Sequence, residues 1–211
     1  MIKNSVDIIL PVYHGNLNEL EESIKKQVQA YKEILKYYKW NIVISINGKD
    51  PEAIINLSKQ LAKKYKNVRY ECTEIQGKGS GVINSWLKSN ADIRVYMDVD
   101  LSVDLRCLPE LINKIGSGYD ISIGSRYHKD SKVKRSFKRK IISIFYHLFL
   151  LKFLLNARYK DAQCGFKAIN KKVAGKILPL VKDRKWFFES EILYIAQKKG
   201  MKIIEIPIIW N

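Results

Sequence analysis

Short apolar runs alternate with longer segments of helical spacing along the first 125 residues, and this alternation constrains the fold most strongly. Each run is too short for a helix, and each intervening segment places its apolar residues on one stripe. Strands separated by helices of this length form parallel sheets with helical crossovers. The pattern predicts an α/β fold with a mainly parallel, mixed sheet flanked by helices. The expected strands are residues 6–12, 41–46, 68–73, 93–97, 119–124 and 203–209. The expected helices are residues 17–38, 51–65 and 188–199, together with a helix that follows a glycine-rich turn at residues 77–81 and ends near residue 89.

One domain, residues 1–211, accounts for the chain, because neither an internal repeat nor a Pro-rich linker divides it. Hydrophobic residues make up 46% of the sequence, enough for a substantial core, so global disorder is excluded. Cys72, Cys107 and Cys164 are scattered and odd in number, which argues against a disulfide framework or a zinc site and fits a reducing compartment. No signal peptide is expected, and no apolar run reaches the 18 residues of a membrane-spanning helix.

The charge is strongly positive, with 38 Lys and Arg against 21 Asp and Glu, which gives +17. Residues 126–160 carry eleven of these cations and one acid, and residues 141–155 hold twelve apolar side chains out of fifteen. Fifteen residues form a helix of roughly 22 Å, shorter than a bilayer core of about 30 Å. We therefore predict that residues 132–158 form a basic, apolar segment at an anionic membrane surface. A core helix beside a solvated basic loop, or a dimerisation helix, remains open.

Two acids, Asp98 and Asp100, follow the fourth expected strand. Ligands of open α/β sheets bind at the carboxyl ends of the strands. Carboxylate oxygens suit Mg²⁺ or Mn²⁺, and such a cation can also hold the oxygens of a diphosphate. The pair therefore predicts a metal site, the alternative being two solvated aspartates in a turn.

Several further motifs occur in a recognisable order. They are Pro11-Val12-Tyr13, Gly77-Lys78-Gly79, Asp98-Val99-Asp100-Leu101-Ser102, Gly124-Ser125-Arg126-Tyr127, residues 161–167 (DAQCGFK), 187–191 (FFESE) and 205–207 (EIP). In this order the chain resembles family 2 glycosyltransferases, and within them the polyprenyl-phosphate glycosyltransferases of the dolichyl-phosphate mannose synthase type.

The resemblance implies a Rossmann-like GT-A domain, peripheral to the cytoplasmic face of a membrane. It would transfer a sugar, with inversion, from a nucleotide-diphosphate sugar of the GDP-mannose or UDP-glucose type to a polyprenyl (dolichyl) phosphate. Metal ligands for Mg²⁺ or Mn²⁺ would be Asp98, Asp100 and Ser102. The implied donor-binding residues are Pro11, Tyr13, Asn47, Gly77, Lys78, Gly79 and Asp98. Arg126, Arg139, Ser143 and Gln163 would bind the acceptor phosphate, and the implied catalytic residues are Asp98, Asp100, Asp161 and Glu191.

The sequence departs from the family pattern in the donor region. His14-Gly15 follows Tyr13 where the family has an acid, although Asn18-Glu19 lies a few residues on, and Asn47-Gly48 replaces a pair of acids. The sugar and the base therefore stay open, as does the oligomeric state. A sugar-phosphate nucleotidyltransferase, a glycosyltransferase with a non-lipid acceptor and an inactive scaffold are the alternatives. Nucleic acid is not an expected partner, because the aromatic residues near the charge lie in the apolar run.

Overall fold

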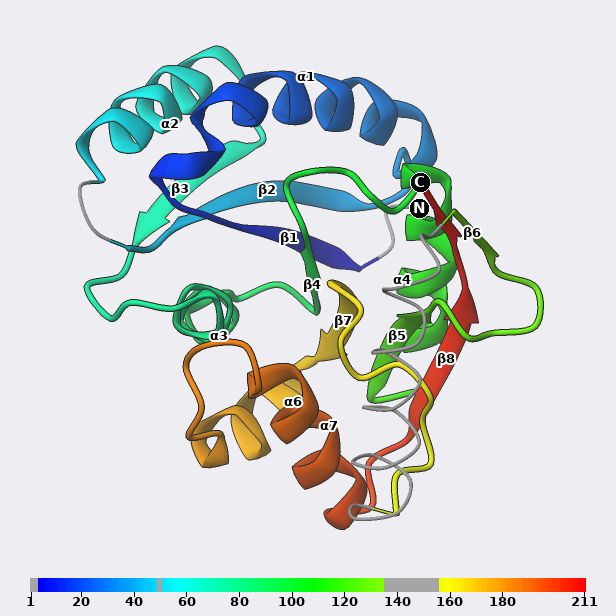
Figure 1. Cartoon of the computed structure of the whole chain (residues 1–211). Helices are drawn as coiled ribbons and strands as arrows, with labels where there is room; N and C mark the ends of the chain where they lie inside the picture. Colours follow the sequence, from blue (N-terminus) through cyan, green and yellow to red (C-terminus); the bar gives the residue numbers. More distant parts are fainter. Residues whose placement is uncertain (1–3, 49–50, 135–155) are drawn as a thin grey trace.

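The computed structural model describes residues 4–48, 51–134 and 156–211 as one α/β domain (Figure 1). Its central sheet has seven strands in the order β3-β2-β1-β4-β7-β5-β8. All neighbours are parallel except β7, which runs antiparallel to both β4 and β5. The strands are β1 (Ser5–Val12), β2 (Lys39–Ile46), β3 (Val68–Cys72), β4 (Ile93–Met97), β5 (Ile121–Ser125), β7 (Phe166–Asn170) and β8 (Ile203–Pro207).

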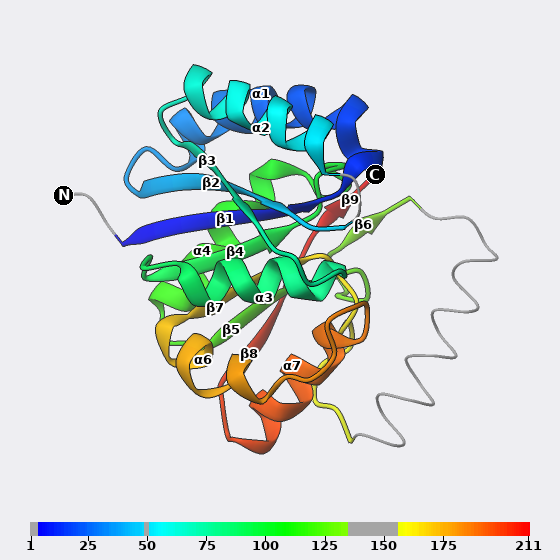
Figure 2. The same cartoon turned by 90° about the vertical axis from the view of Figure 1, so that its left-hand side faces the viewer.

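Helices cover both faces of this sheet and give three layers (Figures 1 and 2). One face carries α1 (Leu17–Ile34), α2 (Glu52–Lys64) and α4 (Leu108–Gly116). The other face carries α3 (Lys78–Lys88), α6 (Lys171–Lys176) and α7 (Phe188–Lys198). A small two-stranded sheet pairs β6 (Lys132–Val133) with β9 (Ile209–Trp210). Within the described residues, no helix combines the length and the apolarity that crossing a bilayer requires.

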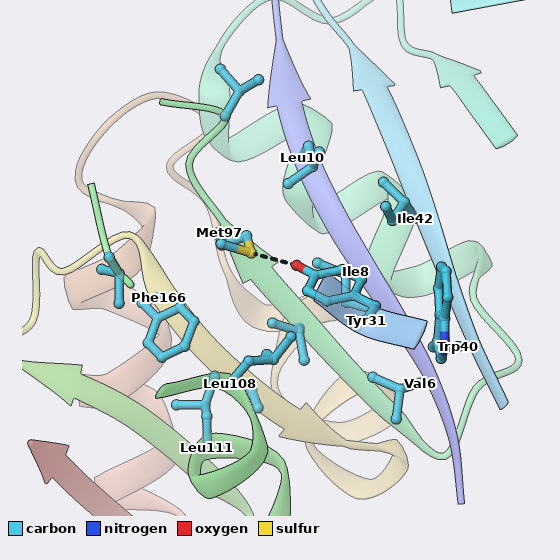
Figure 3. Packing of buried hydrophobic residues seen from close by; sticks show 14 of the residues in the cluster. Val6, Ile8, Leu10, Tyr31, Trp40, Ile42, Met97, Leu108, Leu111 and Phe166 are labelled. Atoms are coloured by element: carbon cyan, nitrogen blue, oxygen red, sulfur yellow. Dashed lines mark hydrogen bonds between the residues drawn. The ribbon is translucent and has the colours of Figure 1, made fainter. Parts of the chain in front are cut away.

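The core beneath α1 and α4 is built from alternate residues of the strands (Figure 3). Val6, Ile8 and Leu10 point to this face of β1, while Ile9 belongs to the cluster on the opposite face, as the two-residue period of a strand requires. Tyr31 of α1 is fully buried here, and its hydroxyl donates to the sulfur of Met97 at 3.2 Å. The last residue of β4, immediately before Asp98, is thus fixed against the helix layer.

The observed elements confirm the predicted fold class and correct some predicted bounds. Helix α1 ends at Ile34 rather than at residue 38, because the backbone leaves helical geometry at Leu35. The expected strand 203–209 is two strands: β8 ends at Pro207, and β9 pairs with β6 in the second sheet. Strand β7 and helices α4 and α6 were not predicted.

The strand order places a switch point between β1 and β4. From β1 the chain moves outward to β2 and β3, and then returns to β4 on the other side of β1. At such a point the connections diverge and leave a crevice at the carboxyl ends of the strands. Pro11 fits this edge, because the β1–β4 ladder stops at Ile9 and Pro11 is paired only with β2. The fold therefore opens next to Asp98.

A buried carboxylate at the opposite, amino-terminal edge links stability to pH. Burial favours the protonated form of Asp7, but hydrogen bonds from Arg69, Ser89 and Asn41 outweigh it, so the pKa of Asp7 lies below its ordinary value. The ionised form therefore stabilises the fold above the ordinary pKa of about 4, and this contribution is lost as the pH falls through the lower native pKa.

Asp7→Asn is expected to lower the free energy of unfolding by about 2 kcal/mol at pH 7, measured by urea denaturation. Below pH 3 the difference from wild type should shrink, because the wild-type carboxyl is then increasingly protonated. Glu22→Gln, an exposed acid of α1, serves as the control, with a change under about 0.5 kcal/mol. A constant Asp7→Asn deficit down to the acid transition would contradict this linkage.

Candidate functional site

A cavity of about 590 Å³ opens at the carboxyl edge of β1, β2 and β4. The ends of these strands, the first residue of α3 and the start of α7 contribute its walls. The lining residues are Pro11, Tyr13, Asn16, Glu19, Asn47, Lys78, Asp98, Val99, Asp100, Arg126, Gln163, Trp186, Glu189 and Trp210. The fold thus brings together residues from eight separate parts of the chain.

Asp98 is the centre of a charged cluster in this cavity. Its Oδ1 lies 2.7 Å from Nζ of Lys78 and accepts a hydrogen bond from the Tyr96 hydroxyl at 3.2 Å. The same hydroxyl lies 3.2 Å from Oε1 of Glu189, whose other oxygen pairs with the buried Lys167. Two carboxylates therefore flank one tyrosine, and each has a lysine partner.

The electrostatics of the cluster favour additional positive charge. Burial raises the pKa of Asp98, Lys78 opposes this rise, and the negative charges of Glu189 and Asp100 add to it. Burial and the two neighbouring carboxylates likewise raise the pKa of Tyr96, which keeps the phenol protonated. A cation that entered here would meet an anionic wall.

Asp100 and Ser102 form the turn after Asp98. The backbone N–H of Ser102 donates to Oδ1 of Asp100 at 3.0 Å, and Leu101 between them adopts a left-handed conformation with φ 55°. No preformed group of three or more His, Cys, Asp or Glu ligands occurs within the described residues. Two carboxylates and a hydroxyl are nevertheless hard oxygen ligands that suit Mg²⁺ or Mn²⁺ together with oxygens of a bound diphosphate.

Gly165 lets the chain pass directly behind Asp98. The Asp98 N–H donates to the Gly165 carbonyl at 3.2 Å, and a Cβ on this glycine would lie 2.0 Å from Oδ2 of Asp98. A side chain at position 165 would therefore displace the carboxylate. This contact explains the glycine in the 161–167 motif.

Arg126 and Asp161 form a two-pronged ion pair at another wall. Nε and Nη2 of Arg126 donate to the two oxygens of Asp161 at 2.7 and 2.6 Å, and the Arg126 backbone N–H adds a third bond at 2.8 Å. The guanidinium also lies over the ring of Trp210 at 5.1 Å. Burial alone would lower the pKa of Arg126, but the bonds to Asp161 raise it above its ordinary value. Of these two residues, Arg126 lines the cavity, whereas Asp161 is buried and does not.

The glycines of the 77–79 motif contact the segment before α7 rather than the cavity. A Cβ on Gly77 would lie 2.1 Å from the Arg184 carbonyl, and one on Gly79 would meet the ring of Phe188 at 2.8 Å. The Gly79 N–H donates to the Lys185 carbonyl at 3.0 Å. Of the three predicted donor-binding residues here, only Lys78 reaches the cavity.

Glu191 also lies outside the cavity lining. Its Oε2 accepts hydrogen bonds from the backbone N–H groups of Lys182 and Asp183 at 3.0 and 2.8 Å. Gln163 does line the cavity, and its amide donates to the Ser190 hydroxyl at 2.9 Å. Glu191 therefore binds the backbone of the segment before α7, whereas Gln163 faces the cavity.

The predicted donor-binding residues Pro11, Tyr13 and Asn47 do meet in the cavity, where Tyr13 is half exposed. Glu19, in the first turn of α1, also lines it and supplies an acid near the position where the family pattern has one. The sequence interpretation missed Glu189, whose role depends on a partner 22 residues away. The predicted acceptor residues Arg139 and Ser143 lie outside the described residues, as does most of the predicted segment 132–158.

A family model described as "Glycosyl transferase family 2" matches residues 7–178, which include β1, Lys78, Asp98, Arg126 and the 161–167 motif. The chain belongs to glycosyl transferase family 2. This finding confirms the family indicated by the motifs, and the matched region contains all of the cavity lining except Trp186, Glu189 and Trp210.

Relatives of this family 2 chain carry names that describe sugar transfer. Glycosyltransferase AglD of Haloferax volcanii is 30% identical over 98% of this chain but only 33% of its own length. A dolichyl-phosphate beta-glucosyltransferase of Dictyostelium discoideum is 30% identical over 99% of this chain and 68% of its own. A dolichol-phosphate mannosyltransferase of Pyrococcus furiosus is 30% identical, with shares of 96% and 55%. The chain thus spans from a third to about two thirds of these relatives.

Solved structures confirm the GT-A fold. Glucosyl-3-phosphoglycerate synthase from Mycobacterium tuberculosis, in complex with Mn²⁺, UDP and its product, has a TM-score of 0.68 at 13% identity, covering 98% of this chain and 71% of that one. Mannosyltransferase PcManGT from Pyrobaculum calidifontis, in complex with GDP-Man and Mn²⁺, has a TM-score of 0.58 at 15% identity, with shares of 98% and 56%.

Proposed function

We propose that this family 2 domain is a metal-dependent, inverting glycosyltransferase that moves a sugar from a nucleotide-diphosphate sugar to a polyprenyl phosphate. The observation that carries the proposal is the cavity at the switch point, which Asp98 and Asp100 line together with Lys78 and Arg126. The acids can bind a metal cation, and the lysine and arginine can bind phosphate oxygens. Together they complement a diphosphate donor and a phosphate acceptor. The names of the relatives support the acceptor class.

The donor nucleotide is assigned to the part of the cavity formed by Pro11, Tyr13, Asn16, Glu19 and Asn47. The half-exposed ring of Tyr13 can stack on a base, and the polar side chains can hydrogen-bond the base or ribose. This arrangement directs the diphosphate toward Asp98 and Lys78 at the carboxyl end of β4.

Asp98, Asp100 and Ser102 would hold Mg²⁺ or Mn²⁺. When bound, the cation would neutralise charge on the departing nucleoside diphosphate. Lys78 can add a second positive charge to the same leaving group, because its ammonium group already reaches the carboxylate of Asp98. The ion pair with Asp98 keeps this lysine in the wall of the cavity.

A lipid phosphate oxygen would attack the anomeric carbon, forming the new carbon–oxygen bond while the bond to the nucleoside diphosphate breaks on the opposite face. The phosphate is already ionised near neutral pH, so the residues must position it rather than deprotonate it. Arg126 and Gln163 line the cavity and are assigned to the acceptor phosphate. Asp161 holds Arg126 in place through its two-pronged bond. Association with the cytoplasmic face of a membrane through residues 132–158 is part of the same proposal.

The test combines binding with transfer. With Mn²⁺ and GDP-mannose or UDP-glucose at about 100 times Kd, the stabilisation should be about 2.7 kcal/mol and the Tm should rise by about 5 to 10 °C. A dispersed short-chain prenyl phosphate should then receive radiolabelled sugar, with EDTA as the control. No thermal shift with any nucleotide-diphosphate sugar would overturn the donor assignment. Pyrophosphate release from a nucleoside triphosphate would indicate a nucleotidyltransferase instead.

A further inference from the structure

The segment between α6 and α7, residues 179–187, presents a concentrated set of exposed apolar side chains. We call it the α6–α7 loop; it is drawn in orange beside one end of α3 in Figure 2. Leu180 is 45% exposed, Trp186 67% and Phe187 43%. Among the described residues, the other large exposed hydrophobic side chains are separated along the chain: Tyr13, Tyr37, Ile75 and Leu87. Surface apolar residues normally occur singly, so a cluster marks an interaction surface.

Cations are interleaved with these apolar residues. Lys182 and Lys185 are exposed and Arg184 is half-buried. The single acid of the loop, Asp183, is turned toward the backbone, where its Oδ1 accepts hydrogen bonds from the N–H groups of Lys185 and Phe188 at 2.9 Å each. The exposed side chains of the loop are therefore mainly apolar or positively charged.

The loop is firmly attached to the scaffold, so the exposure of its aromatic residues belongs to the folded state. Glu191 accepts from two of its backbone N–H groups, and the N–H groups of Gly79 and Ser80 at the start of α3 donate to its carbonyls at 3.0 Å. Gly77 and Gly79 make room for this contact, because a Cβ at either position would collide with the loop or with the adjacent Phe188. The 77–79 and 187–191 motifs of the sequence thus both help to hold the α6–α7 loop in place.

The loop also borders the catalytic cavity. Trp186 lines the cavity, and its ring lies 5.0 Å from the ammonium nitrogen of Lys78. Phe187, the next residue, lines a separate hollow of about 560 Å³ together with Lys182, Asp183, Glu191 and Tyr194. Whatever covers the outward face of the loop therefore lies next to the mouth of the site.

We propose that the α6–α7 loop docks onto an anionic lipid bilayer. Leu180, Trp186 and Phe187 enter the headgroup level, and Lys182 and Lys185 contact lipid phosphates, as amphipathic surface segments with cations do. A protein partner is less favoured by the structure, because both acids beside the aromatic side chains, Asp183 and Glu191, accept hydrogen bonds from backbone N–H groups, whereas Lys182 and Lys185 are exposed. The inference rests on the proposed function in one respect: a polyprenyl phosphate resides in a bilayer, so docking would present the cavity mouth to it.

The test measures binding of the full chain to sonicated vesicles by sedimentation. Wild type, Leu180→Ser/Phe187→Ser and Lys182→Gln/Lys185→Gln are compared on phosphatidylglycerol and phosphatidylcholine vesicles. Each pair of substitutions should weaken binding to phosphatidylglycerol about tenfold or more, and the lysine pair should also reduce the salt dependence. Tyr37→Ser, an equally exposed aromatic residue at the end of α1, is the matched control and should bind like wild type. Far-UV circular dichroism and Tm verify that each variant is folded.

Three outcomes overturn the inference: no binding of wild type to phosphatidylglycerol, unchanged binding of both loop variants, or an equal loss for Tyr37→Ser. If Leu180→Ser/Phe187→Ser does not fold, vesicle binding by Lys182→Gln/Lys185→Gln alone tests the inference. Sugar transfer to a dispersed short-chain prenyl phosphate, measured without vesicles, separates this inference from the proposed function. If the wild type transfers sugar but the loop variants bind vesicles as well as the wild type does, only the docking surface is rejected. If the wild type transfers no sugar, the proposed function is rejected.

Discussion

Asp98→Asn is expected to reduce kcat/KM for sugar transfer by on the order of a thousandfold while leaving the fold intact. Asparagine keeps the size of the side chain but removes the negative charge that pairs with Lys78 and that would hold the cation. Isothermal titration of Mn²⁺ in the presence of donor should show weaker metal binding in the same variant. The Tm should stay within a few degrees of wild type, because Asp98 is only half-buried.

Asp104→Asn is the matched control for Asp98→Asn. Asp104 follows the same strand, but its carboxylate pairs with Arg106, and neither residue lines the cavity. Its activity should remain within about twofold of wild type, because surface substitutions away from a site have small effects. If Asp98→Asn retained more than a tenth of the wild-type kcat/KM, the assignment of this carboxylate to the metal and the leaving group would be wrong.

Lys167→Met is expected to lower the free energy of unfolding by about 3–5 kcal/mol and the Tm by roughly 10 °C. Lys167 and Glu189 are 1% and 2% exposed, and they pair in the middle of the domain. Removing the lysine leaves an uncompensated carboxylate beside the Tyr96 hydroxyl. The double variant Lys167→Met/Glu189→Gln should recover part of the loss, because it removes the stranded charge. Thermal and urea denaturation measure both effects.

Lys172→Met provides the comparison for this buried pair. Lys172 pairs with Asp120 at 3.3 Å, but its side chain is half exposed, so water can replace the interaction. The expected loss is under about 1 kcal/mol. Equal destabilisation by Lys167→Met and Lys172→Met would show that burial of the Lys167–Glu189 pair is not what stabilises this part of the fold.

Local sequence patterns were sufficient for the first half of the fold. The alternation of short apolar runs with segments of helical spacing predicted β1 to β4 and the helices between them, because strands covered on both faces form continuous apolar runs, whereas each helix buries one stripe. Strand β7 was missed because its sequence, FKAIN, places Lys167 at a position that is buried. A lysine there is tolerated only because Glu189 approaches from α7, and no local pattern contains that partner.

For the site, too, local patterns were sufficient for some residues, whereas the roles of others depend on distant segments. The carboxyl-edge rule, which depends only on strand direction, predicted a site at Asp98, and the family resemblance added Tyr13 and Asn47; all three line the same cavity. The rule could not show that Glu191 binds backbone N–H groups of a neighbouring loop, or that Gly77 accommodates Arg184, more than a hundred residues downstream. Roles that depend on what a distant segment places nearby become visible only in three dimensions.

The reversed direction of β7 has a consequence for how this domain can diversify. Strand β5 ends and β7 begins at one rim of the sheet, where Gly124 packs against Phe166 and Cys164. Arg126, directly after β5, and Gly165, directly before β7, therefore lie at the same rim of the sheet, on neighbouring strands. The residues between these two strands can therefore differ in length and composition while every ladder of the seven-stranded sheet is kept; only the β6–β9 pair of the small sheet depends on them. Hybrid enzymes assembled at these two junctions offer a direct way to alter what the rim recognises.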